Sequence, residues 1–335
     1  MKHSWSVTIS LVLLFFVAQV VGLFLLKEDL HVVVEEGGVV SLSFDDTVIG
    51  ERPELSGASS FLYLVVGVGA GTLLLLLLIR FRRLDIWKWW FLLAVFLTLS
   101  VALGVVVPWW FAFLVAALLA WWKVFRPSPL VHNVTEVLMY AGLAVLLVPL
   151  FDVFWASVLL VVMSGYDMFA VWFSKHMVKM AKFQASSGVF AGLMLPSSGS
   201  WLSTAQNGLS KGVSRKGSAG TGVVAKGGGA FSALRASPKK RPRRVGSGSG
   251  RSQAMLGGGD VVFPLLFSGA VLQWLVIERG VSVSAAFVLA VFVSFVVALS
   301  LLGLFLFAKK ERFYPAMPFL TAGCFVGWLG ASLLA

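Results

Sequence analysis

Long apolar segments separated by short polar connections run through most of the chain, and they limit the folds that it can adopt. A helix needs about 20 apolar residues to cross a bilayer, and only helices and closed barrels satisfy every backbone polar group in hydrocarbon. With 59% hydrophobic and 13% charged residues, the composition excludes an ordinary soluble protein. We expect an all-α polytopic membrane protein with nine transmembrane helices. Their expected limits are 5–26, 58–80, 88–107, 109–123, 129–149, 152–175, 260–277, 281–307 and 315–334.

Basic residues gather in every second connection, which indicates how the chain is oriented. The connection after the sixth segment carries thirteen Lys or Arg between Lys179 and Arg251 and no acidic residue. By the positive-inside rule these connections face the cytoplasm, so we expect a cytoplasmic N-terminus and an extracytoplasmic C-terminus. Pro108 separates the third and fourth segments, because proline lacks the amide hydrogen that a continuous helix requires.

The connections divide the chain into three parts. Residues 1–178 hold the first six spans and an acidic segment at about 27–57, which is expected to form a short extracytoplasmic hairpin. Residues 179–256 form a basic cytoplasmic loop rich in Gly and Ser, whose composition predicts that it is largely disordered. Its apolar stretch from Val189 to Leu195 is expected to dock on the helices. Residues 257–335 hold the last three spans.

The distribution of charge and of metal-binding side chains excludes several classes of function. We interpret the basic block from Pro238 to Arg244 as an orientation signal with affinity for anionic membrane lipid, and we expect no nucleic acid as a partner. One cysteine, Cys324, excludes a disulfide framework, and the four scattered histidines lack the spacing of a metal site. We therefore expect no metal and no cofactor.

Two aspartates lie where an ionisable group is unfavourable. Asp167 is inside the sixth apolar segment and Asp260 opens the seventh. A charge at bilayer depth costs roughly 2.5–3.5 kcal/mol, which makes each aspartate a candidate functional residue. Because the basic loop joins the two segments, the carboxylates are expected to meet in the inner half of the bilayer. Such a pair shares a proton, so that one carboxylate is a general base on water while the other polarises a carbonyl. Taken alone, the aspartates also fit an ion relay, a counter-ion or an interhelix hydrogen bond.

Three short motifs lie in the sixth, seventh and ninth segments. They are Tyr166-Asp167, Gly257-Gly258-Gly259-Asp260 and Pro315-Ala316-Met317-Pro318. Together they resemble the YD, GxGD and PAL motifs of the presenilin and signal peptide peptidase family, whose members are nine-span intramembrane aspartyl proteases. The resemblance covers the chain except its loop. It implies that Asp167 and Asp260 are the catalytic pair and that the other motif residues shape the site and bind substrate.

Details of the motifs indicate which members of the family are most similar. Met317 stands where the family usually has leucine, a swap of similar volume that should be tolerated. Pro318 is presenilin-like, whereas Pro264, four residues past Asp260, is more like signal peptide peptidases. A cytoplasmic N-terminus is the presenilin orientation. The chain therefore most resembles a prokaryotic, archaeal presenilin homologue.

The resemblance implies an aspartic endopeptidase that hydrolyses peptide bonds within transmembrane segments of membrane proteins or peptides. It implies a multi-pass location in the cell membrane, and no obligatory partner subunit is evident, while a homo-oligomer stays open. An ion channel or ion-coupled transporter using the same aspartates is an alternative, although we see no inverted repeat of the kind expected in a transporter. A membrane scaffold with the basic loop as a docking arm is a third hypothesis.

Further polar residues receive structural interpretations. Glu136 is expected to pair with His132, one turn earlier, or to face a polar cavity. Asp152 is interpreted as an N-terminal helix charge favoured by the helix dipole. Tyr166 is expected either to pack against the bundle or to donate its hydroxyl to the site. Pro315 has two interpretations: it starts a helix, or it keeps the backbone open beside the aspartates.

Overall fold

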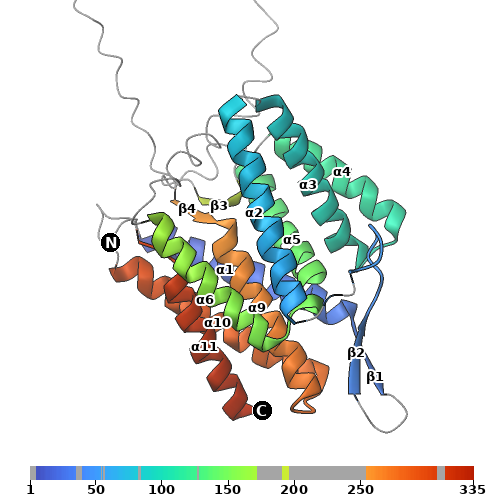
Figure 1. The fold of residues 1–335 in the computed structure, drawn as a ribbon, viewed down its shortest axis with the longest axis vertical. Helices are drawn as coiled ribbons and strands as arrows, with labels where there is room; N and C mark the ends of the chain where they lie inside the picture. Colours follow the sequence, from blue (N-terminus) through green and yellow to red (C-terminus); the bar gives the residue numbers. More distant parts are fainter. Residues whose placement is uncertain are drawn as a thin grey trace, which may run out of the picture. The chain divides into compact units, whose positions relative to one another are not determined.

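Apolar helices make up most of the structure, a computed structural model (Figure 1). It describes residues 5–34, 40–53, 55, 57–81, 84–126, 128–171, 191–195, 254–307 and 314–335. The described residues belong to one compact unit. Most of the basic loop at 179–256 lies outside the described residues, so its expected disorder stays a prediction.

Nine α-helices occupy the described part of the chain, one in each of the nine apolar segments. They are α1 (Trp5–Asp29), α2 (Ala58–Phe81), α3 (Leu84–Gly104), α4 (Trp109–Phe125), α5 (Pro129–Leu147), α6 (Val153–Phe169), α9 (Gly258–Ile277), α10 (Val283–Phe307) and α11 (Met317–Leu334). Seven are long and apolar enough to cross a membrane, whereas α4 and α6 are shorter than that. These helices make the chain an integral multi-pass membrane protein.

The helix boundaries follow from local sequence. Asp152 caps α6 by accepting a hydrogen bond from the Trp155 amide at 2.7 Å, which confirms its interpretation as a helix-start residue. Pro108 is the N-cap of α4, as expected for a break between the third and fourth segments. At the end of α9, Gly280 has a φ of +63° and the Val281 amide donates to the Leu275 carbonyl at 3.0 Å. Only a residue that tolerates positive φ closes a helix in this way.

Two short strands lie in the acidic segment for which the sequence predicts a hairpin. β1 (Leu30–Val34) and β2 (Val40–Phe44) pair antiparallel. Next to them, Arg52 Nη2 contacts Asp29 Oδ2 at 2.6 Å, which ties the segment after the strands to the end of α1.

A second pair of strands comes from the two ends of the basic loop. β3 (Gly192–Leu195) pairs antiparallel with β4 (Ala254–Gly257), with Gly192 opposite Gly257. Leu193 and Leu195 are buried, so the expected docking of this apolar stretch is confirmed for its described residues. Val189 and Phe190 lie outside them. Because β4 runs directly into α9, the pairing sets how α9 begins.

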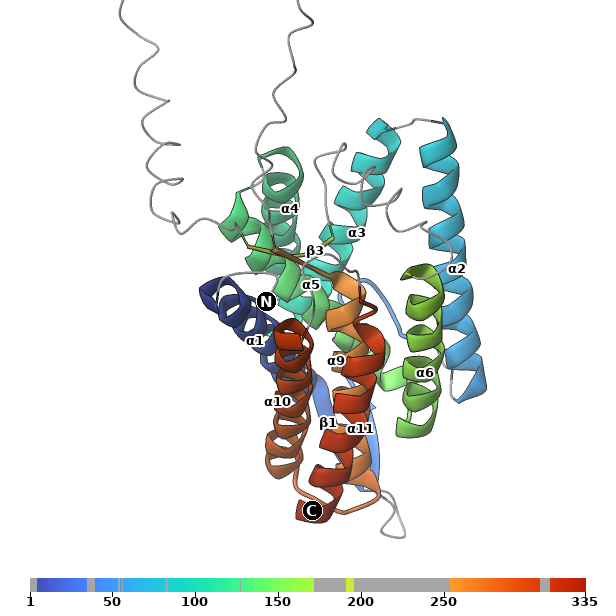
Figure 2. The same ribbon diagram turned by 90° about the vertical axis from the view of Figure 1, so that its left-hand side faces the viewer.

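The helix that carries Asp260 lies in the interior. α9 has 72% of its apolar window buried, the highest share among the seven candidate spans, and α2 has 6%. α1, α6, α10 and α11 all contact α9, and α2 lies on the outer side of α6 (Figures 1 and 2). Asp260 therefore lies on a helix of the core, whereas α2 and α6 lie toward the outside of the bundle.

Small residues allow the helices to approach closely. On α11, Gly323 and Gly327 are four residues apart and face α10, where a Cβ on Gly327 would lie 3.0 Å from the Val293 Cα. On α5, a Cβ on Gly142 would overlap the Thr98 carbonyl oxygen of α3. Without a hydrophobic driving force between helices in lipid, such close packing is a main source of association.

We expect Gly142→Ala to lower the free energy of unfolding by about 1–3 kcal/mol, because the added methyl group must push α3 and α5 apart. Gly303→Ala is the matched control, since a Cβ there meets nothing within 4 Å. Thermal unfolding of both variants in detergent measures the difference. Equal melting temperatures for the two variants would contradict the close α3–α5 contact.

Candidate active site

Asp260 lies in the first turn of α9, directly after the strand β4. Gly257 is the N-cap of α9, and a Cβ at this position would lie 3.2 Å from Asp260 Oδ2. The Gly257 amide lies within electrostatic reach of the Asp260 carboxylate. The carboxylate thus folds back over a residue whose missing side chain leaves it room.

The three glycines before Asp260 have different neighbours. A backbone approaches Gly257, because it pairs with Gly192 of β3. Side chains approach the other two: a Cβ on Gly258 would lie 3.3 Å from Tyr140 Oη, and one on Gly259 would lie 3.3 Å from the Phe263 ring. The first glycine therefore admits a neighbouring backbone, and the next two admit aromatic rings.

Asp167 lies in the last turn of α6, at the start of α11. The Met317 amide donates to Asp167 Oδ2 at 3.1 Å. The first amides of a helix have no acceptor within the helix and carry the positive end of its dipole. Asp167 supplies that acceptor from a different helix, which explains why the third motif lies beside it.

The structure brings the two aspartates of the sequence analysis together. Both are half-buried, and the carboxylates lie close enough to repel each other when both are ionised. The described α-helix α6 ends at Phe169, and the expected limit of its segment at 175 lies outside the described residues. Two acidic groups of this kind can share one proton and act on a water molecule between them.

Polar contacts beside the two aspartates hold their helices in place. Ser164 Oγ and Thr321 Oγ1 are 2.7 Å apart, one turn from the contact between Asp167 and α11. Gln19 of α1 is fully buried and its Nε2 donates to the Val261 carbonyl at 2.8 Å, directly after Asp260. α6, α9 and α11 are thereby each tied by buried side chains close to the carboxylates.

Prolines keep the backbone near the site from closing into regular helix. Pro264 lies inside α9 and has no amide hydrogen, so it cannot donate to the Asp260 carbonyl four residues earlier. Pro318 lies in the first turn of α11, and Pro315 is buried immediately before that helix. Both interpretations of Pro315 have support, because it precedes a helix start whose Met317 amide donates to Asp167.

An apolar groove adjoins the site. Its volume is about 350 Å³, and it is lined by one face of α2, by α6 and by Phe263 of α9. Tyr166, next to Asp167, lines the groove with 53% of its surface exposed. Among the described residues its hydroxyl has no hydrogen-bond partner, so the structure favours a wall of the groove over a donor to the carboxylates.

Sequence reasoning missed several polar residues near the site. Glu136 lies 3.9 Å from His132, as expected, but its closer ion-pair partner is Lys123 of α4 at 2.5 Å. In the sequence, Lys123 lies at one of the basic connections, which indicate only the orientation of the chain. Gln19 could have been identified from the sequence, because it is an isolated amide side chain within an apolar segment. Among the described residues, no group of three or more His, Cys, Asp or Glu could hold a metal ion.

Comparison with known proteins finds relatives over nearly the whole chain. A family model described as signal-peptide peptidase, presenilin aspartyl protease matches residues 21–335. A solved structure of a presenilin family intramembrane aspartate protease in space group C222 has a TM-score of 0.57 and 17% identity, covering 98% of this chain and 99% of that one. One in space group P2 has a TM-score of 0.53 and 16% identity, covering 97% of each chain. No curated protein matches the chain.

Proposed function

The chain belongs to the signal peptide peptidase and presenilin family of aspartyl proteases, and on this premise we propose that Asp167 and Asp260 are its catalytic pair. Membership makes the protein an intramembrane aspartic endopeptidase. One observation carries the proposal: α6 and α9 bring two half-buried carboxylates within electrostatic reach of each other, at the start of α11. We assign Gly257, Gly258, Gly259 and the stretch from Pro315 to Pro318 the role of shaping this site.

The pair hydrolyses a peptide bond by general acid–base catalysis. One carboxylate takes a proton from a water molecule, and the other, protonated, donates a hydrogen bond to the scissile carbonyl. The Met317 amide of α11 stabilises negative charge on Asp167, so we assign it the role of base and Asp260 that of acid. Carboxyl ¹³C shifts of labelled aspartates test this assignment, and a protonated Asp167 beside an ionised Asp260 would reverse it.

Substrates are transmembrane segments that reach the site along the groove between α2 and α6. The groove is apolar and outward-facing, which suits a helix arriving from lipid, and Tyr166 and Phe263 line it beside the carboxylates. A helical peptide bond is shielded by its own hydrogen bonds, so the substrate must unwind locally before cleavage. An extended strand then finds unpaired backbone near β4 or Pro315.

The finer features of the topology belong to the same proposal. We assign all nine helices as spans, including the short α4 and α6, with a cytoplasmic N-terminus and an extracytoplasmic C-terminus in the cell membrane. The alternating basic connections support this orientation. Residues 1–178 and 257–335 then form the membrane parts, and 179–256 is a cytoplasmic loop. We propose no obligatory partner subunit.

The comparisons give no support to the channel or transporter alternative. Purified protein in liposomes separates the hypotheses when it is mixed with a membrane-spanning reporter and its fragments are identified by mass spectrometry. We expect cleavage inside the apolar segment of the reporter. Ion flux without fragments would favour the alternative.

We predict that Asp167→Asn and Asp260→Asn each abolish cleavage while the protein stays folded, because an amide neither accepts the proton from water nor acts as a carboxylic acid. Both variants should melt at or above the temperature of the unsubstituted protein, since each removes one of two partly buried ionisable groups that repel each other when both are charged. Reporter cleavage and thermal unfolding are measured together. Near-native cleavage by either variant would refute the two-carboxylate mechanism.

We predict that Pro315→Ala lowers cleavage about tenfold, or about 1.4 kcal/mol in the barrier. Alanine has an amide hydrogen and lets α11 extend toward its N-terminus, so the Met317 amide that now donates to Asp167 would turn to a carbonyl of the added turn. Ala316→Leu should also lower cleavage by filling space beside the carboxylates. Met317→Leu is the control and should be nearly neutral. If cleavage rates only follow melting temperatures, the motif is merely a helix start.

A further inference from the structure

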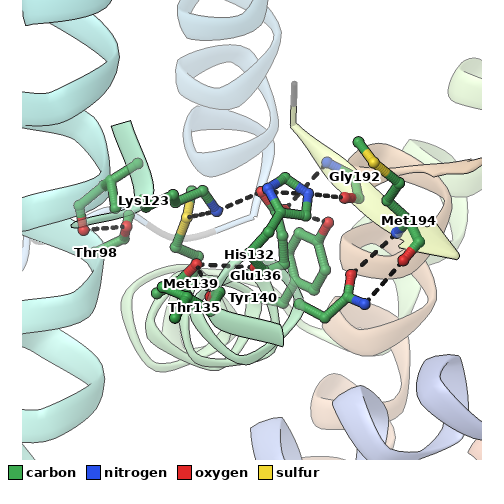
Figure 3. A network of polar contacts seen from close by, with 12 residues as sticks. Thr98, Lys123, His132, Thr135, Glu136, Met139, Tyr140, Gly192 and Met194 are labelled. Carbon is green, nitrogen blue, oxygen red and sulfur yellow. Dashed lines mark hydrogen bonds and ion pairs between the residues drawn. The ribbon is translucent and has the colours of Figure 1, made fainter. Parts of the chain in front are cut away.

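A cluster of buried polar side chains lies between α4 and α5, outside the proposed catalytic pair (Figure 3). Glu136 has no exposed surface and Lys123 is 4% exposed, and Glu136 Oε1 lies 2.5 Å from Lys123 Nζ. Burying an ion pair in place of apolar side chains gives little or no gain in stability. The cluster therefore calls for an explanation other than holding α4 against α5.

Side chains of α5 hold the strand β3 through its backbone. The Gly192 amide donates to Glu136 Oε2 at 3.1 Å, and His132 Nε2 donates to the Gly192 carbonyl at 2.8 Å. Asn133 donates to the Met194 carbonyl at 2.8 Å and accepts from the Met194 amide at 3.0 Å. Since Gly192 is opposite Gly257 in the strand pair, this first route leads from Glu136 to the residue against which the Asp260 carboxylate folds.

A second route leads from the same carboxylate oxygen to Asp260. The Tyr140 hydroxyl donates to Glu136 Oε2 at 2.5 Å, and Tyr140 is only 3% exposed. Its hydroxyl oxygen lies where a Cβ on Gly258 would be 3.3 Å away, and it is within electrostatic reach of Asp260. Its hydrogen bond thus holds the Tyr140 side chain against the backbone of Gly258, two residues before Asp260.

We propose that Glu136 is a positioning residue for Asp260: its Oε2 accepts from Gly192 and Tyr140 at once, and so fixes both the strand that precedes α9 and the first turn of that helix. Lys123 neutralises the charge that this acceptor brings into the membrane. The inference rests on the proposed catalytic role of Asp260. The proposed role depends on the hydrogen bonds that Glu136 Oε2 accepts and not on its buried charge. Substitutions that separate these two properties therefore test it.

Two double variants separate acceptance from charge. Lys123→Met/Glu136→Gln and Lys123→Met/Glu136→Leu both remove the ion pair, and their residues at position 136 are similar in size, but only glutamine keeps an oxygen that can accept from Gly192 and Tyr140. With a reconstituted full-length protein and a saturating membrane-spanning reporter, we expect the glutamine double variant to keep kcat within about threefold. The leucine double variant should lose about tenfold or more.

Tyr140→Phe gives a second measurement that does not depend on how the double variants fold. It removes only the hydroxyl and leaves the ring against Gly258 and the Glu136–Gly192 hydrogen bond in place. We expect kcat to fall about tenfold with KM changed less than about twofold, because the position of Asp260 affects the chemical step and not substrate binding. Ser294→Ala is the matched control: it removes a buried hydroxyl that donates to Ser268 of α9 at 3.1 Å, and kcat should not change.

The outcomes distinguish this inference from the proposed function. Equal kcat values in the two double variants, whether high or low, would overturn the positioning role of Glu136, and so would an unchanged kcat in Tyr140→Phe. If the leucine double variant does not fold, Tyr140→Phe decides alone. Asp260→Asn is assayed in parallel: if it remains active, the proposed catalytic pair fails, whereas an inactive Asp260→Asn with an unaffected Tyr140→Phe overturns only the positioning role.

Discussion

The structure depends on one constraint: within hydrocarbon, every charge and every backbone amide must find its partner inside the protein. Asp167 meets this constraint at the start of α11, where the Met317 amide has no acceptor in its own helix and donates to it. Asp260 meets it at the start of α9, within electrostatic reach of the Gly257 amide. Both carboxylates therefore lie at helix starts, the places in a membrane protein where backbone donors are available.

The same helix starts leave the backbone around the site irregular. Pro264 withholds an amide from the Asp260 carbonyl, and Pro315 precedes the first turn of α11. β4 is extended up to Gly257, and Tyr166 and Phe263 line an apolar groove. An unwound substrate needs backbone partners of this kind, because it gives up its own helical hydrogen bonds before it is cut. The apolar groove and the polar helix starts thus suit two successive states of one substrate.

The apolar segments and the residues that begin helices predicted much of the fold. The helix starts near Pro108 and Asp152 follow from local chemistry, since the missing amide hydrogen and the capping carboxylate act within one turn. The meeting of Asp167 and Asp260 followed from their sidedness and from the family resemblance. The partners of Glu136 did not follow: Lys123 belongs to the basic connections that only indicate orientation, and nothing in the sequence placed Gly192 beside Glu136. Those contacts join three separate elements, α4, α5 and β3, and the pattern within one helix carries no information about the elements packed against it.

The sequence by itself determined that this chain crosses a membrane many times and that two carboxylates enter it, because hydropathy and charge are properties of single segments. Only the tertiary structure decided what each carboxylate touches. It placed the Met317 amide on Asp167, a buried tyrosine behind Gly258, and a strand from the far end of the loop against Gly257. The physical reason is packing: which faces of the helices meet depends on the joint fit of small residues such as Gly142 and Gly327 across several helices.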